Sequence, residues 1–394
     1  MKRGGQSLRN EDRISNLPDA LLVQILSSLP TKAVVASSVL SKRWRSLWKT
    51  MPSLEFSYNA TNDLESFSDN VCRCLLSHQA PLLLQSLDLK VDFDDENSVD
   101  YDIGILLGVA FGLHVRELKL EVNSRKDYPQ IFHPPGYNRL LRLNGVRYKD
   151  DVSVVNLLSG CSHLENLEIH LYTQSDVKTF NIDFPYLQRL IIYSVGEVVY
   201  VVKAPSLKYL KVEGHIDFDS ILIGNTPELE EAVIDTAYTV YDYNLESFTS
   251  ITFPTGIIFS QLVYLELYTY KANKWNLLML MLDASPKLQI LKLTGFGPRY
   301  EEEDDVSNHG EEDDDVACEK WNQPKNVPEC LLLYLHNLVW EFYEGQQEEE
   351  KEVAKYILKN ACFLKKATFV SLMGSVEECE SMVRASSSCQ LVFK

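Results

Sequence analysis

A chain of 394 residues is longer than one ordinary compact core requires, and with 45% hydrophobic residues it can bury two or three cores or one long repeat array. The net charge of −18 opposes approach to a phosphate backbone, so nucleic acid is a poor partner for the whole molecule. The longest apolar run, residues 103–113, falls short of the ~20 residues that span a bilayer and predicts a buried element, with no membrane as partner.

The cysteines and the start of the chain indicate a reducing compartment. The eight cysteines are scattered, and the only close pair, Cys72 and Cys74, has neither zinc-finger nor thioredoxin spacing. Residues 1–9 are basic and no apolar stretch follows them, so they read as a flexible tail and not as a secretory signal. We therefore expect reduced thiols and a location in the nucleus, the cytoplasm or both.

Residues 10–56 are expected to form three short helices. Pro18 and Asp19 suit the first turn of a helix that Pro30 stops. Its apolar residues recur at helical spacing and make one broad face. These residues are Leu21, Leu22, Ile25, Leu26 and Leu29.

Two further helices follow in the same module. Thr31 is expected to cap the second helix and Ser41 the third. On the third helix Trp44, Leu47 and Trp48 share one face, with basic residues around it. A unit of about forty residues seldom buries so many large side chains, so either another chain or the following domain is expected to cover some of them.

The stretch ISNLPDALLVQILSSLPTKAVVASSVLSKRWRSLW closely resembles the F-box, in the form found in plant F-box/leucine-rich-repeat/FBD proteins. This resemblance implies docking on a Skp-type adaptor, which links such proteins to a cullin–RING ubiquitin ligase. A basic, tryptophan-bearing helix suits an acidic adaptor, because apolar contacts supply affinity and the cations steer association. The expected adaptor-binding residues are Leu17, Pro18, Leu21, Leu22, Ile25, Leu26, Leu29, Pro30, Val39, Leu40, Trp44, Leu47 and Trp48.

A helical connector and then a degenerate repeat follow the F-box-like module. Residues 57–80 carry Leu64, Phe67, Val71 and Leu75 at helical spacing, which predicts an N-terminal cap for the array. Across residues 81–299 the phrase L-x-x-L-x-L recurs, for example as LENLEI, LKYLKV and LVYLEL. Each phrase supplies one strand that cannot bury its own leucines, so the predicted fold is an α/β leucine-rich-repeat solenoid with a parallel concave sheet. The asparagines of regular repeats are mostly missing, so the opposite side should be irregular.

In such a sheet the leucines point inward and the alternate residues, up to Thr294 in the last phrase, face solvent. Tyrosines among mixed charges suit a protein-binding surface, although an ordinary solvated sheet would look the same. The expected target-binding residues are Tyr193, Tyr209, Lys211, Tyr264, Glu266 and Tyr268.

The acidic run at residues 300–320 reads as an open linker and lacks the spacing of a calcium loop. Residues 321–394 then predict a strand, a helix with acidic residues first and lysines last, and two more strands, as a small α+β module. Trp321-x-x-Pro324 and the stretches VPECLL and YILKNA resemble the FBD module of the same plant family, which places F-box, repeats and FBD in this order.

Catalytic signatures are missing from the sequence. It contains no G-x-S-x-G, H-E-x-x-H or P-loop motif, and the histidines are isolated from one another. No metal site, cofactor or enzymatic activity is therefore predicted. The resemblance implies a substrate-recognition subunit of a Skp–cullin–F-box ubiquitin ligase that binds a target protein for degradation. A non-catalytic interaction scaffold, or a small-molecule co-receptor acting outside ubiquitination, remains the alternative.

Overall fold

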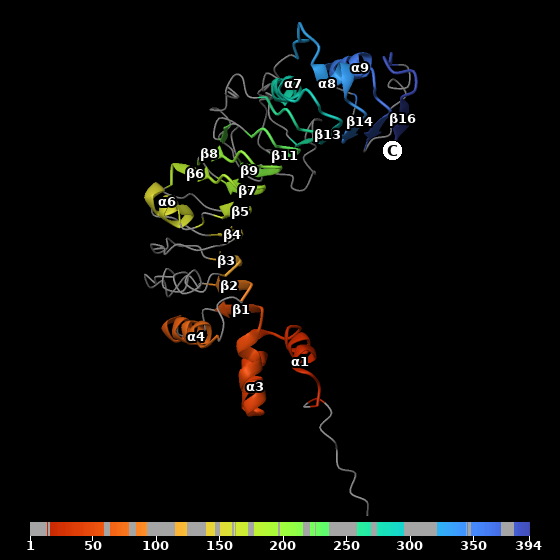
Figure 1. Cartoon of the computed structure of the whole chain (residues 1–394). Helices are drawn as coiled ribbons and strands as arrows, with labels where there is room; N and C mark the ends of the chain where they lie inside the picture. Colours follow the sequence, from red (N-terminus) through yellow and green to blue (C-terminus); the bar gives the residue numbers. More distant parts are fainter. Residues whose placement is uncertain are drawn as a thin grey trace, which may run out of the picture. The chain divides into compact units, whose positions relative to one another are not determined.

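In the computed structural model the chain forms two compact units, Met1–Arg142 and Leu143–Lys394, which are described separately. The helices and strands of both units are labelled in Figure 1. The described residues are 14, 16–58, 64–78, 84–92, 115–123, 139–145, 150–159, 161, 163–171, 177–195, 198–215, 221–224, 226–235, 258–268, 274–294, 321–343, 345, 348–371 and 382–394. The predicted tail at 1–9, the apolar run at 103–113 and the acidic linker at 300–320 lie outside them.

The first unit begins with a helical module of short helices. They are α1 (Asp19–Leu26), α2 (Thr31–Ala36), the 3-10 helix η1 (Ser37–Val39), α3 (Lys42–Leu47) and the 3-10 helix η2 (Trp48–Thr50). Helix α1 starts at Asp19, with Pro18 at the cap position before it and not in the first turn as predicted, and ends at Leu26, well before Pro30. The hydroxyls of Ser27 and Ser28 donate to carbonyls three residues back, and such local bonds compete with continuation of the helix.

One predicted cap is confirmed and the other is wrong. The hydroxyl of Ser41 accepts a hydrogen bond from the backbone N–H of Trp44 at 3.4 Å, which caps α3. Thr31 does not cap α2, because Pro30 occupies the cap position. The buried Thr31 hydroxyl instead accepts from the N–H of Glu55 at 2.8 Å and ties α2 to the following strand.

The remainder of the first unit is a parallel sheet with a covering helix. Strand β1 (Ser53–Tyr58) pairs with β2 (Ser86–Asp92), which pairs with β3 (Glu117–Asn123). The predicted connector helix is present as α4 (Leu64–Ser77), with Val71 and Leu75 buried and the Phe67 ring 5.4 Å from that of Tyr58. Strand β4 (Leu140–Asn144) spans the boundary between the units.

The second unit is built on parallel strands whose registers align. In sheet order they are β5 (Asn166–Leu171), β7 (Arg189–Val195), β9 (Tyr209–His215), β11 (Glu231–Asp235), β12 (Tyr264–Tyr268), β13 (Ile290–Thr294), β14 (Asn337–Glu341), β15 (Lys366–Val370) and β16 (Gln390–Phe393). The leucines of the repeated phrase are buried and the residues between them are partly exposed, as in β12. This alternation confirms that one side of each strand faces the core.

A repeated turn determines which side chains of these strands face the core. Before β7, β9, β11 and β13 a leucine N–H donates to the carbonyl three residues back, at 3.1–3.3 Å, and closes a turn that contains a proline. The four donors are Leu187, Leu207, Leu229 and Leu288. Because every turn ends in a buried leucine, each following strand enters the sheet with its leucines inward.

A second parallel sheet contradicts the prediction of an irregular opposite side. It contains β6 (Thr179–Asp183), β8 (Val199–Lys203) and β10 (Ile221–Ile223), in the order β10-β8-β6. Alternating apolar residues drive its formation: the rings of Phe180 and Tyr200 stack at 5.7 Å with no solvent exposure. Over this part of the chain each repeat therefore contributes two strands. Helices α6 (Asp151–Ser159) and α7 (Lys274–Ala284) occupy other inter-strand segments.

The C-terminal residues form helices and strands, as predicted, and their strands extend the main sheet. Strand β14 pairs in parallel with β13, and β15 and β16 follow in the same sense. Helices α8 (Glu329–Leu333) and α9 (Glu348–Asn360) connect these strands, since parallel neighbours need a crossover. The apolar residues of α9 are buried, namely Val353, Ala354, Ile357 and Leu358, and so is Ala361 directly after the helix. Within the described ranges, no helix combines the length and apolarity needed to cross a bilayer.

Candidate interaction surfaces

The predicted adaptor-binding residues divide into a buried set and an exposed set. The buried set forms the core of the helical module, with at most 8% of any side chain exposed: Leu22, Leu26, Trp44, Leu47 and Trp48. These five side chains pack against their own chain, and their expected role in adaptor binding stays a prediction. Helical spacing alone could not separate them from their neighbours, since the apolar face of α1 is wider than its core contact.

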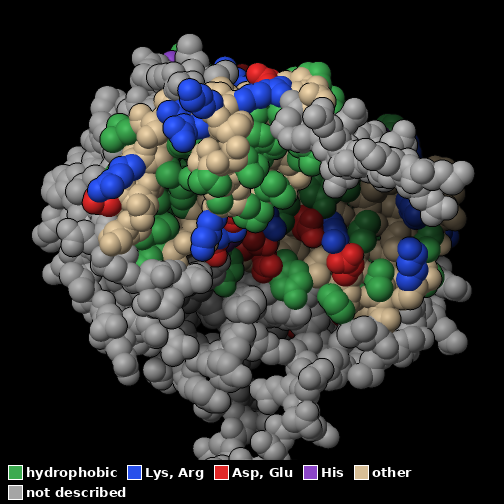
Figure 2. Space-filling model, turned by 90° about the horizontal axis from the view of Figure 1, so that it is seen from below, with side chains coloured by type: hydrophobic (Ala, Val, Ile, Leu, Met, Phe, Trp, Pro, Cys, Tyr) green, Lys and Arg blue, Asp and Glu red, His purple; other side chains and the backbone are tan. Residues whose placement is uncertain are grey.

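The exposed set keeps large apolar side chains in solvent. It comprises Leu21, Ile25, Leu29, Val39 and Leu40, and Val39 reaches 83% exposure. Pro18 and Pro30 are also exposed and Leu17 is half-buried. Seen from the end where α1 and α3 lie, hydrophobic side chains gather in a group with lysine and arginine side chains beside it (Figure 2). An apolar group with a basic edge is the arrangement expected of a protein-docking surface.

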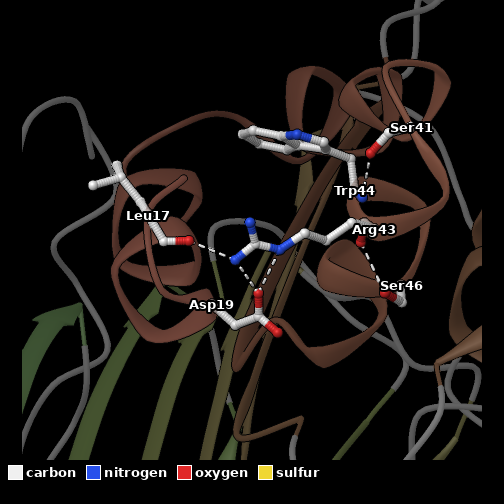
Figure 3. Close-up of polar contacts among 6 residues, drawn as sticks. All are labelled: Leu17, Asp19, Ser41, Arg43, Trp44 and Ser46. Atoms are coloured by element: carbon white, nitrogen blue, oxygen red, sulfur yellow. Dashed lines mark hydrogen bonds and ion pairs between the residues drawn. The ribbon is translucent and has the colours of Figure 1, made fainter. Parts of the chain in front are cut away.

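Arg43 ties the start of α1 to α3 (Figure 3). Its Nε donates to Oδ1 of Asp19 at 2.7 Å, and its Nη2 donates to the same oxygen and to the carbonyl of Leu17. Ser41 and Ser46 bond to the α3 backbone on either side of this contact. The sequence suggested only a helix-dipole role for Asp19, because its partner lies 24 residues away. The contact sets the position of the Leu17-Pro18 segment relative to α3.

The six predicted target-binding residues lie on one side of the main sheet, which we call the sheet face. Register places Tyr209 two strands from Tyr264, in the row that also holds Glu231. Lys211 and Glu266 share the next row, and Tyr193 and Tyr268 share the third. Each of the six is partly exposed, so the structure brings these residues together on an accessible surface.

Ion pairs and hydrogen bonds cross the strands of the sheet face. Lys292 Nζ lies 3.0 Å from Glu266 and 3.1 Å from Glu341, and the Tyr264 hydroxyl donates to Glu266 at 2.8 Å. Partial burial lowers the pKa of Lys292, but hydrogen bonds to the two carboxylates and their charges outweigh it, so its net pKa is raised. Burial, together with the hydrogen bond to Glu266, also raises the pKa of Tyr264. At neutral pH the lysine is charged and the tyrosine is neutral.

Two tyrosine rings of the sheet face also contact a guanidinium group and an imidazole ring. The Arg189 guanidinium carbon lies 3.8 Å from the centroid of the Tyr209 ring, a cation–π contact. The His170 ring stacks on that of Tyr193 at 5.8 Å. Lys211 Nζ lies 2.6 Å from Glu213 on its own strand.

Two details of the sheet face differ from the prediction or were missed by it. Thr294 was expected in solvent but is 4% exposed, and its hydroxyl donates to Glu341 at 3.3 Å. Glu341 was not foreseen as part of this surface, because its strand was assigned to the C-terminal α+β module and not to the repeats. Its pairing with Lys292 depends on the register between β13 and β14. The chain between these two strands carries no copy of the repeated phrase, so the sequence did not predict this register. Among the described residues, no cluster of three or more His, Cys, Asp or Glu side chains is placed to hold a metal ion.

Comparison with known proteins gives two domain matches and full-length relatives. A family model described as the F-box domain matches residues 14–56, and one described as FBD matches residues 323–369. An F-box/FBD/LRR-repeat protein of Arabidopsis thaliana is 48% identical over 445 aligned residues, covering all of this chain and 98% of the relative. A putative FBD-associated F-box protein of the same plant is 44% identical over 434 residues, covering 97% of this chain and 98% of that protein.

Proposed function

This chain belongs to the family of F-box/FBD/LRR-repeat proteins, and from that premise we propose that it is the substrate-recognition subunit of a Skp–cullin–F-box ubiquitin ligase. In this proposal the helical module is a three-helix F-box that docks on a Skp-type adaptor. The parallel array is a leucine-rich-repeat solenoid whose sheet face binds a target protein. The chain contributes recognition and no catalytic step, and it works in the nucleus, the cytoplasm or both.

The exposed apolar set of the helical module is the observation that carries the proposal. Leu21 and Ile25 lie one turn apart on α1, and each has 46% of its surface exposed although the module has a complete core beneath them. Burying a leucine or isoleucine fully is worth about 1.5–3 kcal/mol, so five such side chains are a large incentive to associate. Small soluble modules seldom keep this much apolar area in water unless a partner covers it.

The charges beside the apolar set favour an acidic partner. Lys32, Lys42 and Arg45 are exposed in the same module, while the chain as a whole carries −18. The positive charge of this module attracts an acidic protein to this site, and the negative charge of the rest of the molecule repels the same protein from other surfaces. The charge of the helical module therefore supports the same docking site as its exposed apolar side chains.

Co-purification tests the proposal. The full chain should retain both a Skp-type adaptor and a cullin from cell extract, and the double variant Leu21→Asp/Ile25→Asp should lose both. Leu333→Asp is the matched control, because Leu333 on α8 has 48% exposure but lies in the other unit. Retention of the adaptor by the double variant would contradict the docking surface. If the unmodified chain retained the adaptor but not the cullin, the proposed role in a ubiquitin ligase would be contradicted, and the role of an interaction scaffold would be supported.

A further inference from the structure

On the sheet face, β11 carries two carboxylates and β12 carries two tyrosines and a carboxylate. We call their outward residues the β11–β12 patch: Glu231, Val233 and Asp235 on β11, and Tyr264, Glu266 and Tyr268 on β12. The register places Glu231 opposite Tyr264 and Asp235 opposite Tyr268. At each end of the patch, therefore, a carboxylate and an aromatic ring lie on adjacent strands, roughly 5 Å apart along the hydrogen-bonding direction.

Such a pair is chemically suited to a cation. A guanidinium or ammonium group gains from the face of a tyrosine ring and from a charge-assisted hydrogen bond to a carboxylate. The neighbouring strands of the same face already contain one half of this arrangement, since Arg189 lies over the Tyr209 ring at 3.8 Å. A tyrosine on this face thus accepts a guanidinium in the protein's own structure.

The centre of the patch already contacts a basic side chain of the protein itself. Glu266 binds Lys292 at 3.0 Å and accepts from the Tyr264 hydroxyl at 2.8 Å. On β9, β11, β12, β13 and β14 the outward carboxylates outnumber the outward lysines: Glu213, Glu231, Asp235, Glu266 and Glu341 against Lys211 and Lys292. The net negative charge of this part of the face calls for positive charge on whatever covers it.

We propose that the β11–β12 patch binds an extended segment of the target protein through two basic side chains four residues apart. This inference rests on the proposed function, in which the sheet face receives the target. Tyr264 and Tyr268 are four residues apart on one strand, roughly 13 Å at ~3.3 Å per residue. An extended segment running along β12 presents side chains of positions i and i+4 at the same separation. One cation contacts Glu231 and Tyr264, and the other contacts Asp235 and Tyr268.

Fluorescence polarisation on the full chain tests the proposal with defined peptides. The probe is a fluorescein-labelled serine/threonine peptide with two arginines four positions apart. It is compared with a peptide whose arginines are two apart and with one that carries glutamates instead. We expect the four-apart arginine peptide to bind at least about tenfold more tightly than either comparison, and the affinity to fall with added salt. Equal affinity for the two arginine spacings, or for arginine and glutamate, would overturn the proposal.

Variants locate the binding on the patch. Glu231→Gln/Asp235→Asn should weaken binding by about tenfold or more, while the control pair Asp183→Asn/Glu352→Gln removes the same charge from β6 and α9 without effect. Tyr268→Leu should weaken binding and Tyr268→Phe should retain it, since only the former removes the ring. Equal losses in the patch and control pairs would reduce the effect to net charge and contradict the site.

Adaptor co-purification of the same variants separates the two levels of the argument. Variants of the patch should keep the adaptor, because they lie outside the helical module. A chain that binds the adaptor but shows no preference for the arginine peptide would overturn only this inference. A chain that binds the peptide but no adaptor would overturn the proposed ligase role and leave the patch intact.

Discussion

Arg43 of α3 donates from Nε to Oδ1 of Asp19, at 2.7 Å, and so joins two helices whose residues are 24 positions apart in the chain. The side chains of Arg43 and Asp19 are 37% and 66% exposed, so the ion pair alone is worth at most about 1 kcal/mol. The further bond from Arg43 to the Leu17 carbonyl gives this arginine a second role, because the bond holds the Leu17-Pro18 segment in place.

We therefore expect Arg43→Ala to lower the free energy of unfolding of the helical module by about 1 kcal/mol and to weaken adaptor binding by more than that loss explains. Amide hydrogen exchange in α1 reports the first effect and titration with the adaptor reports the second. The matched control is Arg73→Ala, which removes an exposed i,i+4 ion pair to Asp69 at 3.5 Å and should change neither. Unchanged α1 exchange in Arg43→Ala would show that the contact does not order the module.

Their burial predicts that two of the expected adaptor-binding residues, Trp44 and Leu40, contribute to different properties, one to stability and the other to adaptor binding. Trp44→Ala should cost about 3–5 kcal/mol and unfold the helical module, because Trp44 fills its core with 8% exposure. Leu40→Ala should change stability by less than about 0.5 kcal/mol, since Leu40 is 66% exposed, yet weaken adaptor binding. Circular dichroism and adaptor pull-down together distinguish these outcomes. A folded Trp44→Ala variant that has lost only adaptor binding would contradict the assignment of Trp44 to the core.

Gly214 marks a position where β9 tolerates no side chain. Its φ is +109°, and a Cβ there would lie 2.2 Å from the backbone oxygen of Ser194 on β7. Gly214→Ala should therefore destabilise the second unit by more than about 3 kcal/mol, through backbone strain and displacement of the neighbouring strand. Gly224→Ala is the control, because a methyl group added there would meet the Val202 backbone oxygen at 3.1 Å, a contact that a small shift relieves. Urea denaturation of both variants measures the difference.

The raised pKa of Lys292 predicts a loss of stability at alkaline pH. Hydrogen bonds to Glu266 and Glu341 overcome the opposing effect of burial, so the folded protein holds this proton more tightly than the unfolded chain, whose lysine pKa is 10.5. The stabilisation is thus complete below pH 10.5 and disappears as the pH rises through the higher pKa of the folded state.

Lys292→Met measures this contribution directly. The difference in free energy of unfolding between wild type and variant should be about 1–3 kcal/mol at pH 8 and should shrink above the folded-state pKa. Lys355→Met, which removes a lysine 3.9 Å from Glu348 on an exposed helical surface, should give a smaller difference at pH 8. A difference for Lys292→Met that grows with pH would reverse the inferred sign.

Local periodicity allowed much of the fold to be predicted. The helical spacing of Leu64, Phe67, Val71 and Leu75 predicted α4, and the alternation in LVYLEL predicted which side of β12 is buried. Each pattern can be recognised within a single element, because side chains return to the same face of a helix or a strand every few residues. The outward positions of the six target-binding candidates followed from the same alternation.

What the sequence by itself determined is the identity of the elements and the two faces of each strand, since these depend on neighbours a few positions away. Only the tertiary structure decided that Trp44 is core while Leu40 is surface, that β14 continues the main sheet, and that Glu341 reaches Lys292. Burial and strand register are set by contacts between segments far apart in the chain, and no local pattern records which partner an apolar or charged side chain will meet.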